Sequence, residues 1–266
     1  MGFRVSQPSF QSLYVEIQAR GKTIGNGTAF VAAAEGGDAF LLTNRHIVTG
    51  RHQDTEELLS KSGATPDSLL VWHNASTELG QFIPVDVPLY EGESPLWIEH
   101  PTLGPEADFV ALRLPTRTDI RVYPYHAKHL AHMEIAPAQT VSVVGFPFGE
   151  RTGPSFAVWA TGFVASEPEI DHGGKPVFLI DCRSRPGQSG SPVILHRGYR
   201  DTIADATEAA IMSELLGIYS GRISEESDLG VVWKTCEIVD LLEYATILSH
   251  ENSVTTPAAN ERPGDR

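Results

Sequence analysis

The chain has 266 residues, of which 41% are hydrophobic, enough to bury a substantial core in one large domain or two small ones. Its formal net charge of −14 argues against a general affinity for nucleic acid or for an anionic membrane surface. Residues 1–22 lack the apolar stretch of a secretory signal, and no segment reaches the ~20 apolar residues of a membrane span. We therefore expect a cytoplasmic protein, with export by another route left open.

Cys182 and Cys236 are the only cysteines. Neither lies in a Cys-x-x-Cys pair or in a Cys/His group with zinc spacing. We expect two separate reduced thiols, with Cys182 in a buried strand.

Short apolar runs, bounded by Gly, Pro, Asn and Asp, predict strands rather than long helices. In the first half the runs are 12–19, 28–34, 39–44, 68–73, 82–90 and 108–115. In the second half they are 140–146, 156–165, 176–182, 191–196, 215–220 and 229–234. Many of these runs are β-branched and alternate in polarity, as strands of sandwiches and barrels do.

The remaining segments set the domain boundaries. We expect a first domain over 1–125 with an insertion at 49–67, a linker at 126–139, and a second domain over 140–250. Within the insertion, 55–63 has the pattern of a short amphipathic helix, and 236–250 has that of a C-terminal helix. The polar, proline-containing stretch 251–266 predicts a disordered tail.

Ser189 lies in the strongest local signal, the sequence Arg-Pro-Gly-Gln-Ser-Gly-Ser-Pro-Val over residues 185–193. A nucleophilic serine needs an exposed hydroxyl, a nearby base and backbone N–H groups directed at the developing oxyanion. Gly187 lets the backbone turn its N–H toward such an oxyanion, and Gly190 allows a substrate chain to approach closely. By itself, the same sequence is also compatible with an ordinary turn between strands.

Two further segments supply possible partners. His46 follows the apolar run in Leu-Leu-Thr-Asn-Arg-His-Ile-Val, where a base would be held rigidly, although a lone histidine there is more often structural. Asp108 leads directly into the run 109–112, as either a strand-edge cap or a buried carboxylate that needs a partner. Orienting an imidazole is such a role. The order His, Asp, Ser differs from the Ser, acid, His order of α/β-hydrolases, and Ser191 stands where that fold has a glycine.

The chain resembles the trypsin-like serine peptidases, particularly the bacterial HtrA (DegP-like) proteases and glutamyl endopeptidases. The matching segments are GNGTAFV (25–31), LLTNRHIV (41–48), ADFVALRL (107–114), VVGFPFG (143–149), ATGFVASE (160–167), LIDCRSRPGQSGSPV (179–193) and LLGIYSG (215–221). The resemblance implies an all-β fold of two six-stranded antiparallel β-barrels with the active site between them. It implies a His46, Asp108, Ser189 triad and an oxyanion hole formed by the N–H groups of Gly187 and Ser189.

The same resemblance assigns substrate contacts. Ser220, Gly221 and Arg222 would form an edge strand that pairs with the substrate backbone. Arg183, six residues before Ser189, would shape the pocket for the residue before the scissile bond. A basic Arg183 would favour acidic side chains there, whereas an arginine directed at solvent would not, and the sequence leaves both open.

The chain also departs from parts of the family. Gln188 replaces the aspartate that binds a freshly cut N-terminus in animal digestive members, so we expect no activation by that salt bridge. We expect no PDZ-like domain after the last motif. His126, His129 and His132 repeat at a spacing of three, but without carboxylate or cysteine partners nearby they indicate a solvated linker rather than a metal site.

The sequence thus predicts a serine endopeptidase that acts on protein or peptide substrates, with no metal, no cofactor and no nucleic-acid or membrane partner. Two alternatives stay open. One is a gated or inactive protein that keeps the fold as a binding module. The other is a serine-dependent esterase on the same fold.

Overall fold

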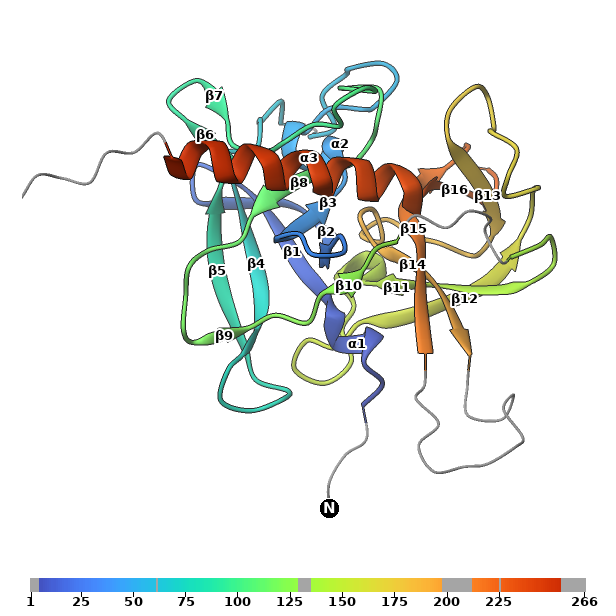
Figure 1. The fold of residues 1–266 in the computed structure, drawn as a ribbon, viewed down its shortest axis with the longest axis horizontal. Coiled ribbons are helices and arrows are strands. Elements are labelled where there is room, and N and C mark those ends of the chain that lie inside the picture. The colour runs from blue at the N-terminus through green and yellow to red at the C-terminus, as the bar shows by residue number, and fades with distance from the viewer. Residues whose placement is uncertain (1–4, 61, 129–134, 198–211, 225, 255–266) are drawn as a thin grey trace, which may run out of the picture.

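Residues 5–60, 62–128, 135–197, 212–224 and 226–254 are described by the computed structural model (Figure 1). The first half contains α1 (Pro8–Gln11), β1 (Ser12–Ala19), β2 (Lys22–Ala33), β3 (Ala39–Thr43), α2 (Arg45–Thr49), β4 (Ser68–Ala75), β5 (Phe82–Pro88), β6 (Tyr90–Glu91), β7 (Ser94–Pro95), β8 (Val110–Arg113), β9 (Ile120–Arg121) and β10 (Tyr125–His126). The second half contains β11 (Thr140–Gly145), the 3₁₀ turn η1 (Pro147–Gly149), β12 (Val158–Val164), β13 (Val177–Asp181), β14 (Pro192–Arg197), β15 (Met212–Arg222), β16 (Leu229–Lys234) and α3 (Thr235–Val254).

The second half is a closed antiparallel barrel with the strand order β11-β12-β13-β16-β15-β14. Alternate side chains of these strands fill its interior, among them Val143, Phe178, Ile180 and Val193. This barrel, the all-β class and the C-terminal helix confirm the fold predicted from the sequence.

The first half is a curled sheet with the main order β5-β4-β1-β2-β3-β8. Among the described residues, no pairing joins β8 to β5, so hydrogen bonds do not close this half into a complete barrel. Part of the free edge of β8 is taken instead by Ile98, whose N–H and C=O both bond to Ala111. β10 joins the same sheet by pairing in parallel with β2.

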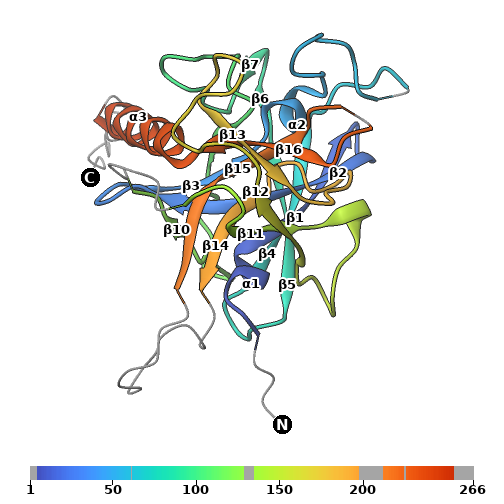
Figure 2. The ribbon, with the colours of Figure 1, turned by 90° about the vertical axis from the view of Figure 1, so that its right-hand side faces the viewer.

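A shared core holds the two halves together. Phe30 and Phe109 from the first half, Ile194 and Trp233 from the second, and Leu241 of α3 belong to one buried cluster. In Figure 1, α3 runs across both halves of the molecule, and Figure 2 shows the same helix nearly along its axis. The ring centroids of Phe109 and Trp233 are 5.6 Å apart, which fixes the residue next to Asp108 against the second barrel.

The predicted helix at 55–63 is wrong. The N–H of His52 donates to the carbonyl of Glu57 at 2.8 Å, and Arg51 forms a β-bridge with Leu58. Glu56 adopts φ 55°, which a right-handed helix excludes. Most side chains of the stretch are exposed, so a helix there would bury no apolar face that could offset its nucleation cost. Residues 51–58 thus form a loop closed by the bridge between Arg51 and Leu58, the clasp loop.

Three other expectations concern the linker and tail, membrane-spanning helices, and the two cysteines. His129, His132 and most of the expected tail lie outside the described residues, although α3 continues to Val254. Within the described part of the chain, no helix is long and apolar enough to cross a membrane. Cys182 and Cys236 are both free thiols, as expected. Cys182 is buried, but it directly follows β13 instead of lying within the strand.

Candidate active site

His46 lies on α2, a helix of five residues that directly follows β3. The helix ends at Gly50, whose φ of 66° allows its N–H to bond the His46 carbonyl at 3.0 Å. A Cβ at position 50 would lie 2.5 Å from Pro66 Cδ, so glycine is required there. The sequence placed His46 at the end of a strand. A helix this short leaves no periodic signal.

Asp108 is buried and binds His46 through both carboxylate oxygens. His46 Nδ1 lies 2.7 Å from Asp108 Oδ2, and the His46 backbone N–H donates to Oδ1 at 3.0 Å. The Ser220 hydroxyl also donates to Oδ2. Asn44 Nδ2 holds the backbone carbonyl of Asp108 at 2.6 Å. Since a carboxylate only accepts hydrogen bonds, Nδ1 of His46 carries a proton, and in the neutral ring Nε2 keeps a lone pair.

Ser189 lies in the turn between β13 and β14. Its hydroxyl donates to the Ser220 carbonyl at 3.5 Å, and this is its one hydrogen bond among the described residues. Ser220 therefore connects the serine to Asp108, with its carbonyl next to Ser189 and its hydroxyl next to the carboxylate. The structure thus brings His46, Asp108, Ser189 and Ser220 into one group. The sequence had assigned Ser220 to substrate binding only.

The backbone around Ser189 is held in a fixed path by turn hydrogen bonds. The carbonyl of Pro186 accepts the Phe148 N–H at 2.6 Å, and the carbonyl of Gln188 accepts the Ser191 N–H at 3.0 Å. In a trans peptide the C=O and the following N–H point in opposite directions. These two bonds therefore orient the N–H groups of Gly187 and Ser189, and neither N–H has an acceptor among the described residues. Two such N–H groups beside a hydroxyl can stabilise an oxyanion.

Gln188 supports this turn from within. Its side chain is fully buried, and its Oε1 accepts the backbone N–H of Arg185 at 2.7 Å. Gln188 stands where animal digestive members have an aspartate that binds a cut N-terminus. Here its side-chain amide instead bonds the backbone of the same turn.

The predicted substrate strand is open on one side. β15 pairs with β14 only as far as Ile218, and Tyr219 exchanges two backbone hydrogen bonds with Gly190 and Ser191. Beyond that point, the described pairing of Gly221 and Arg222 is with β16 alone. An extended peptide can add to such an edge directly beside Ser189.

Arg183 is exposed, whereas the next residue, Ser184, is fully buried. The Ser184 hydroxyl is hydrogen-bonded to the Tyr219 hydroxyl. Burial raises the pKa of Tyr219 to about 12, so this phenol stays neutral and fills the barrel interior behind the Ser189 turn. Of the two alternatives for Arg183, a pocket residue or an arginine directed at solvent, its exposure agrees with the second.

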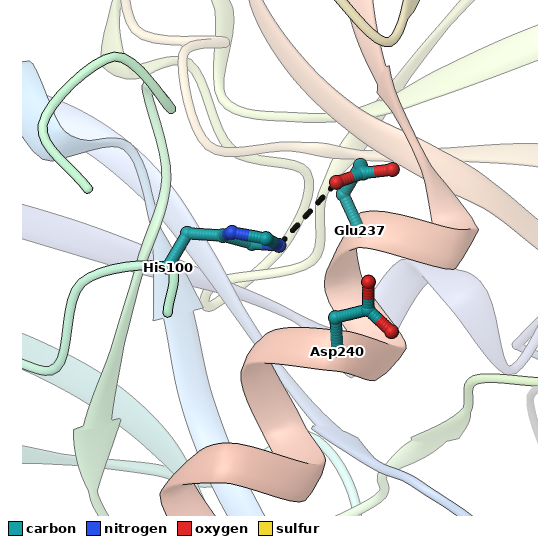
Figure 3. A group of neighbouring side chains, drawn as sticks. All are labelled: His100, Glu237 and Asp240. Carbon is teal, nitrogen blue, oxygen red and sulfur yellow. Dashed lines mark ion pairs between the residues drawn. The ribbon is translucent and has the colours of Figure 1, made fainter. Parts of the chain in front are cut away.

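One group outside this site has the residue types of a metal centre. His100, Glu237 and Asp240 bring potential ligand atoms within 4.8 Å of one another (Figure 3). However, His100 Nδ1 accepts the backbone N–H groups of Thr102 at 3.3 Å and Leu103 at 3.2 Å. Nδ1 therefore has no proton, and the neutral ring carries it on Nε2, which faces Glu237 Oε2 at 3.4 Å. A protonated Nε2 offers no lone pair to a metal, so the group instead connects α3 to the turn before Asp108.

Comparisons with known proteins agree with this architecture. Residues 27–199, more than half of the chain, match the family described as trypsin-like peptidase domain. A search of curated proteins gives no match.

Solved structures share the fold at low sequence identity. The Rv3671c protease of M. tuberculosis in its active form has 17% identity and a TM-score of 0.50, with 97% of this chain and 85% of that chain covered. A thermostable serine protease, AL20, from an extremophilic microorganism has 12% identity and a TM-score of 0.54, with 90% and 98% covered. The HtrA-type protease AlgW with a tripeptide has 15% identity and a TM-score of 0.51, with 90% and 60% covered.

Proposed function

The chain belongs to the trypsin-like peptidase family, and from this premise we propose that it is a serine endopeptidase with Ser189 as nucleophile, His46 as general base and Asp108 as the group that orients His46. The observation that carries the proposal is the contact of 2.7 Å between His46 Nδ1 and Asp108 Oδ2, with Ser189 connected to the same carboxylate through Ser220.

The chemistry is acyl transfer in two stages. Ser189 Oγ attacks the scissile carbonyl while its proton passes to Nε2 of His46, and the N–H groups of Gly187 and Ser189 stabilise the oxyanion. The C–N bond then breaks as His46 returns the proton to the leaving amine. Water repeats the sequence on the acyl-enzyme and releases the acid.

The Ser189 hydroxyl rotates away from the Ser220 carbonyl to reach His46 Nε2 in this reaction. Hydrogen bonds of a catalytic group are often long before the substrate binds, and the 3.5 Å bond from Ser189 is weak enough to be exchanged. The open edge of β15 receives the substrate backbone at Ser220 and Gly221, so the bound segment is an extended peptide.

Labelling with a fluorophosphonate probe tests the site. The wild-type protein should react, Ser189→Ala should not, and Ser224→Ala should react like wild type because Ser224 is an exposed serine on the loop after β15. A wild-type protein that does not react, or a Ser189→Ala protein that reacts equally, would contradict the assignment.

Incubation with a proteome-derived peptide library separates the peptidase from the two alternatives. A peptidase generates new peptide termini that disappear in Ser189→Ala. An esterase hydrolyses activated esters without generating new peptide termini, and an inactive binding module does neither. The residues before the cut sites also report whether acidic side chains are preferred.

A further inference from the structure

We propose that Thr28 is a positioning residue for the oxyanion-binding turn, through a side-chain hydroxyl that fixes the peptide plane between the two N–H donors. This inference rests on the proposed function. It concerns a residue of β2 in the first half of the chain that acts on a turn of the second half.

Thr28 is fully buried where the two halves meet. Its hydroxyl donates to the Gly187 carbonyl at 2.9 Å and accepts the Phe146 N–H at 3.3 Å. Its backbone N–H donates to the Ser189 carbonyl at 2.9 Å. Thr28 therefore bonds the carbonyls of Gly187 and Ser189 in the turn, and it also bonds the backbone N–H of Phe146.

The hydroxyl acts on the middle of three consecutive peptide planes. The 186–187 plane is anchored through Pro186 and Phe148, and the 188–189 plane through Gln188 and Ser191. The plane between them has two restraints: inside the turn its Gln188 N–H donates to the Arg185 carbonyl at 3.1 Å, and from outside the turn Thr28 Oγ1 donates to its Gly187 carbonyl at 2.9 Å. Because consecutive planes share a Cα, a shift of the middle plane moves the Cα atoms of Gly187 and Gln188 and with them the two planes that carry the oxyanion donors.

Gly187 gives the bond from Thr28 its importance. Its φ is 94°, and a Cβ there would lie 2.4 Å from the Phe146 carbonyl oxygen, so only glycine fits. Glycine is also the residue whose backbone rotates most freely. The internal bond from the Gln188 N–H restrains one side of this plane, and the Thr28 hydroxyl restrains the carbonyl side, next to the freely rotating glycine.

The anchor also connects the serine to the other half of the site. The Thr28 carbonyl accepts the Thr43 hydroxyl at 2.8 Å, and Thr43 directly precedes Asn44, which holds the Asp108 carbonyl at 2.6 Å. Hydrogen bonds therefore run from the Asp108 side of the site through Thr28 to Ser189. Thr28 thus links the segment that precedes His46 to the turn that carries the oxyanion donors.

Replacing Thr28 by valine tests this role, because valine keeps the shape and removes the hydroxyl. The loss of one oxyanion donor lowers kcat by roughly 10²–10³ in enzymes of this kind, and misplaced donors should have part of that effect. We expect Thr28→Val to lower kcat about tenfold to hundredfold with KM within twofold. Thr28→Ser keeps the hydroxyl and should stay within about threefold of wild type in kcat.

A matched control separates positioning from loss of stability. Thr235 is also buried, and its hydroxyl donates to the Leu215 carbonyl at 2.8 Å, away from the site. Thr235→Val should lose stability to a similar extent while kcat is unchanged. If Thr28→Val does not fold at 25 °C, Thr28→Ala, which leaves space instead of a methyl group, is compared at a temperature where it is folded.

A second readout isolates the oxyanion. A peptide aldehyde forms a tetrahedral adduct with Ser189, and its inhibition constant should rise in Thr28→Val by the same factor as kcat falls. A non-covalent product peptide should bind as it does to wild type. The inference is overturned if kcat stays within twofold, if both inhibitors weaken equally, or if Thr28→Ser is as impaired as Thr28→Val.

These outcomes are distinct from a failure of the proposed function. A wild-type protein that reacts with fluorophosphonate and cleaves peptides establishes the activity whatever Thr28 does. A wild-type protein that does neither overturns the activity and the role of Thr28 together.

Discussion

Asp108 engages His46 twice, through the ring at 2.7 Å and through the backbone N–H at 3.0 Å. The two contacts use different carboxylate oxygens, so the carboxylate cannot rotate without losing one of them. The orientation of the imidazole is therefore set by the same residue that fixes the start of α2.

This double contact predicts the effect of Asp108→Asn. The backbone N–H of His46 requires an oxygen, so the amide NH₂ would face the ring and force Nδ1 to accept a hydrogen bond. The proton would then lie on Nε2, and His46 could no longer take a proton from Ser189. We expect kcat for peptide cleavage to fall by roughly 10⁴. Asp86→Asn, an exposed aspartate on β5, serves as control, and a loss below tenfold in Asp108→Asn would contradict this geometry.

Local sequence patterns predicted most of the strands and singled out His46, Asp108 and Ser189 as candidate site residues. The run 12–19 coincides with β1, and 229–234 coincides with β16, because alternation and β-branching act within a few residues. The short helix α2 was not predicted, since it depends on Gly50 fitting against Pro66.

Contacts between distant parts of the chain could not be predicted in the same way. Thr28 lies 159 residues from Gly187, and Ser220 lies 112 residues from Asp108. No local pattern records either hydrogen bond. The predicted helix at 55–63 failed for the same reason, because Gln53 and Arg45 hold the clasp loop in place by tertiary contacts.

The hydrogen bonds of His100 lead us to expect that the protein does not bind divalent metal ions at this residue. His100 Nδ1 accepts two backbone N–H groups, so its Nε2 is protonated and cannot bind a metal. We expect 100 µM Zn²⁺ or Mn²⁺ to leave the Tm of wild type and of Glu237→Gln equally unaffected. An increase in Tm that is lost in Glu237→Gln would show that the ring changes tautomer and that the group binds metal.

The burial of His73 leads us to expect that the protein loses stability in acid. His73 is fully buried in the first half, and neither ring nitrogen has a hydrogen-bond partner in the described structure. Burial lowers the pKa of His73 to about 4, while an unfolded histidine has a pKa near 6.5. The unfolded chain therefore binds the proton first, and stability falls as the pH decreases from about 6.5 to 4.

The difference in pKa corresponds to about 3 kcal/mol in the free energy of unfolding, lost across that range. Urea unfolding at pH 7, 6, 5 and 4 measures it. His73→Phe removes the titrating group and should reduce the pH dependence by about that amount. An unchanged pH dependence in His73→Phe would assign the effect to other groups.

The clasp loop offers a comparison between two neighbouring residues. Gln53 Nε2 donates to the carbonyls of Pro105 at 2.6 Å and Glu106 at 3.2 Å, just before Asp108. Asp54 next to it pairs with Lys175 of the second half at 3.1 Å, but the two side chains are 67% and 43% exposed. The two Gln53 bonds lie at the surface, although Gln53 is itself half-buried. An intramolecular hydrogen bond contributes about 1 kcal/mol, and an exposed ion pair contributes less.

We therefore expect Gln53→Ala to lower the free energy of unfolding by about 1–2 kcal/mol and Asp54→Asn by less than about 1 kcal/mol. Urea unfolding at low salt and at 0.5 M NaCl measures both, and the difference between Asp54→Asn and wild type should vanish at high salt because the ion pair is screened. A larger effect for Asp54→Asn than for Gln53→Ala would mean that the clasp loop is held mainly by the second barrel.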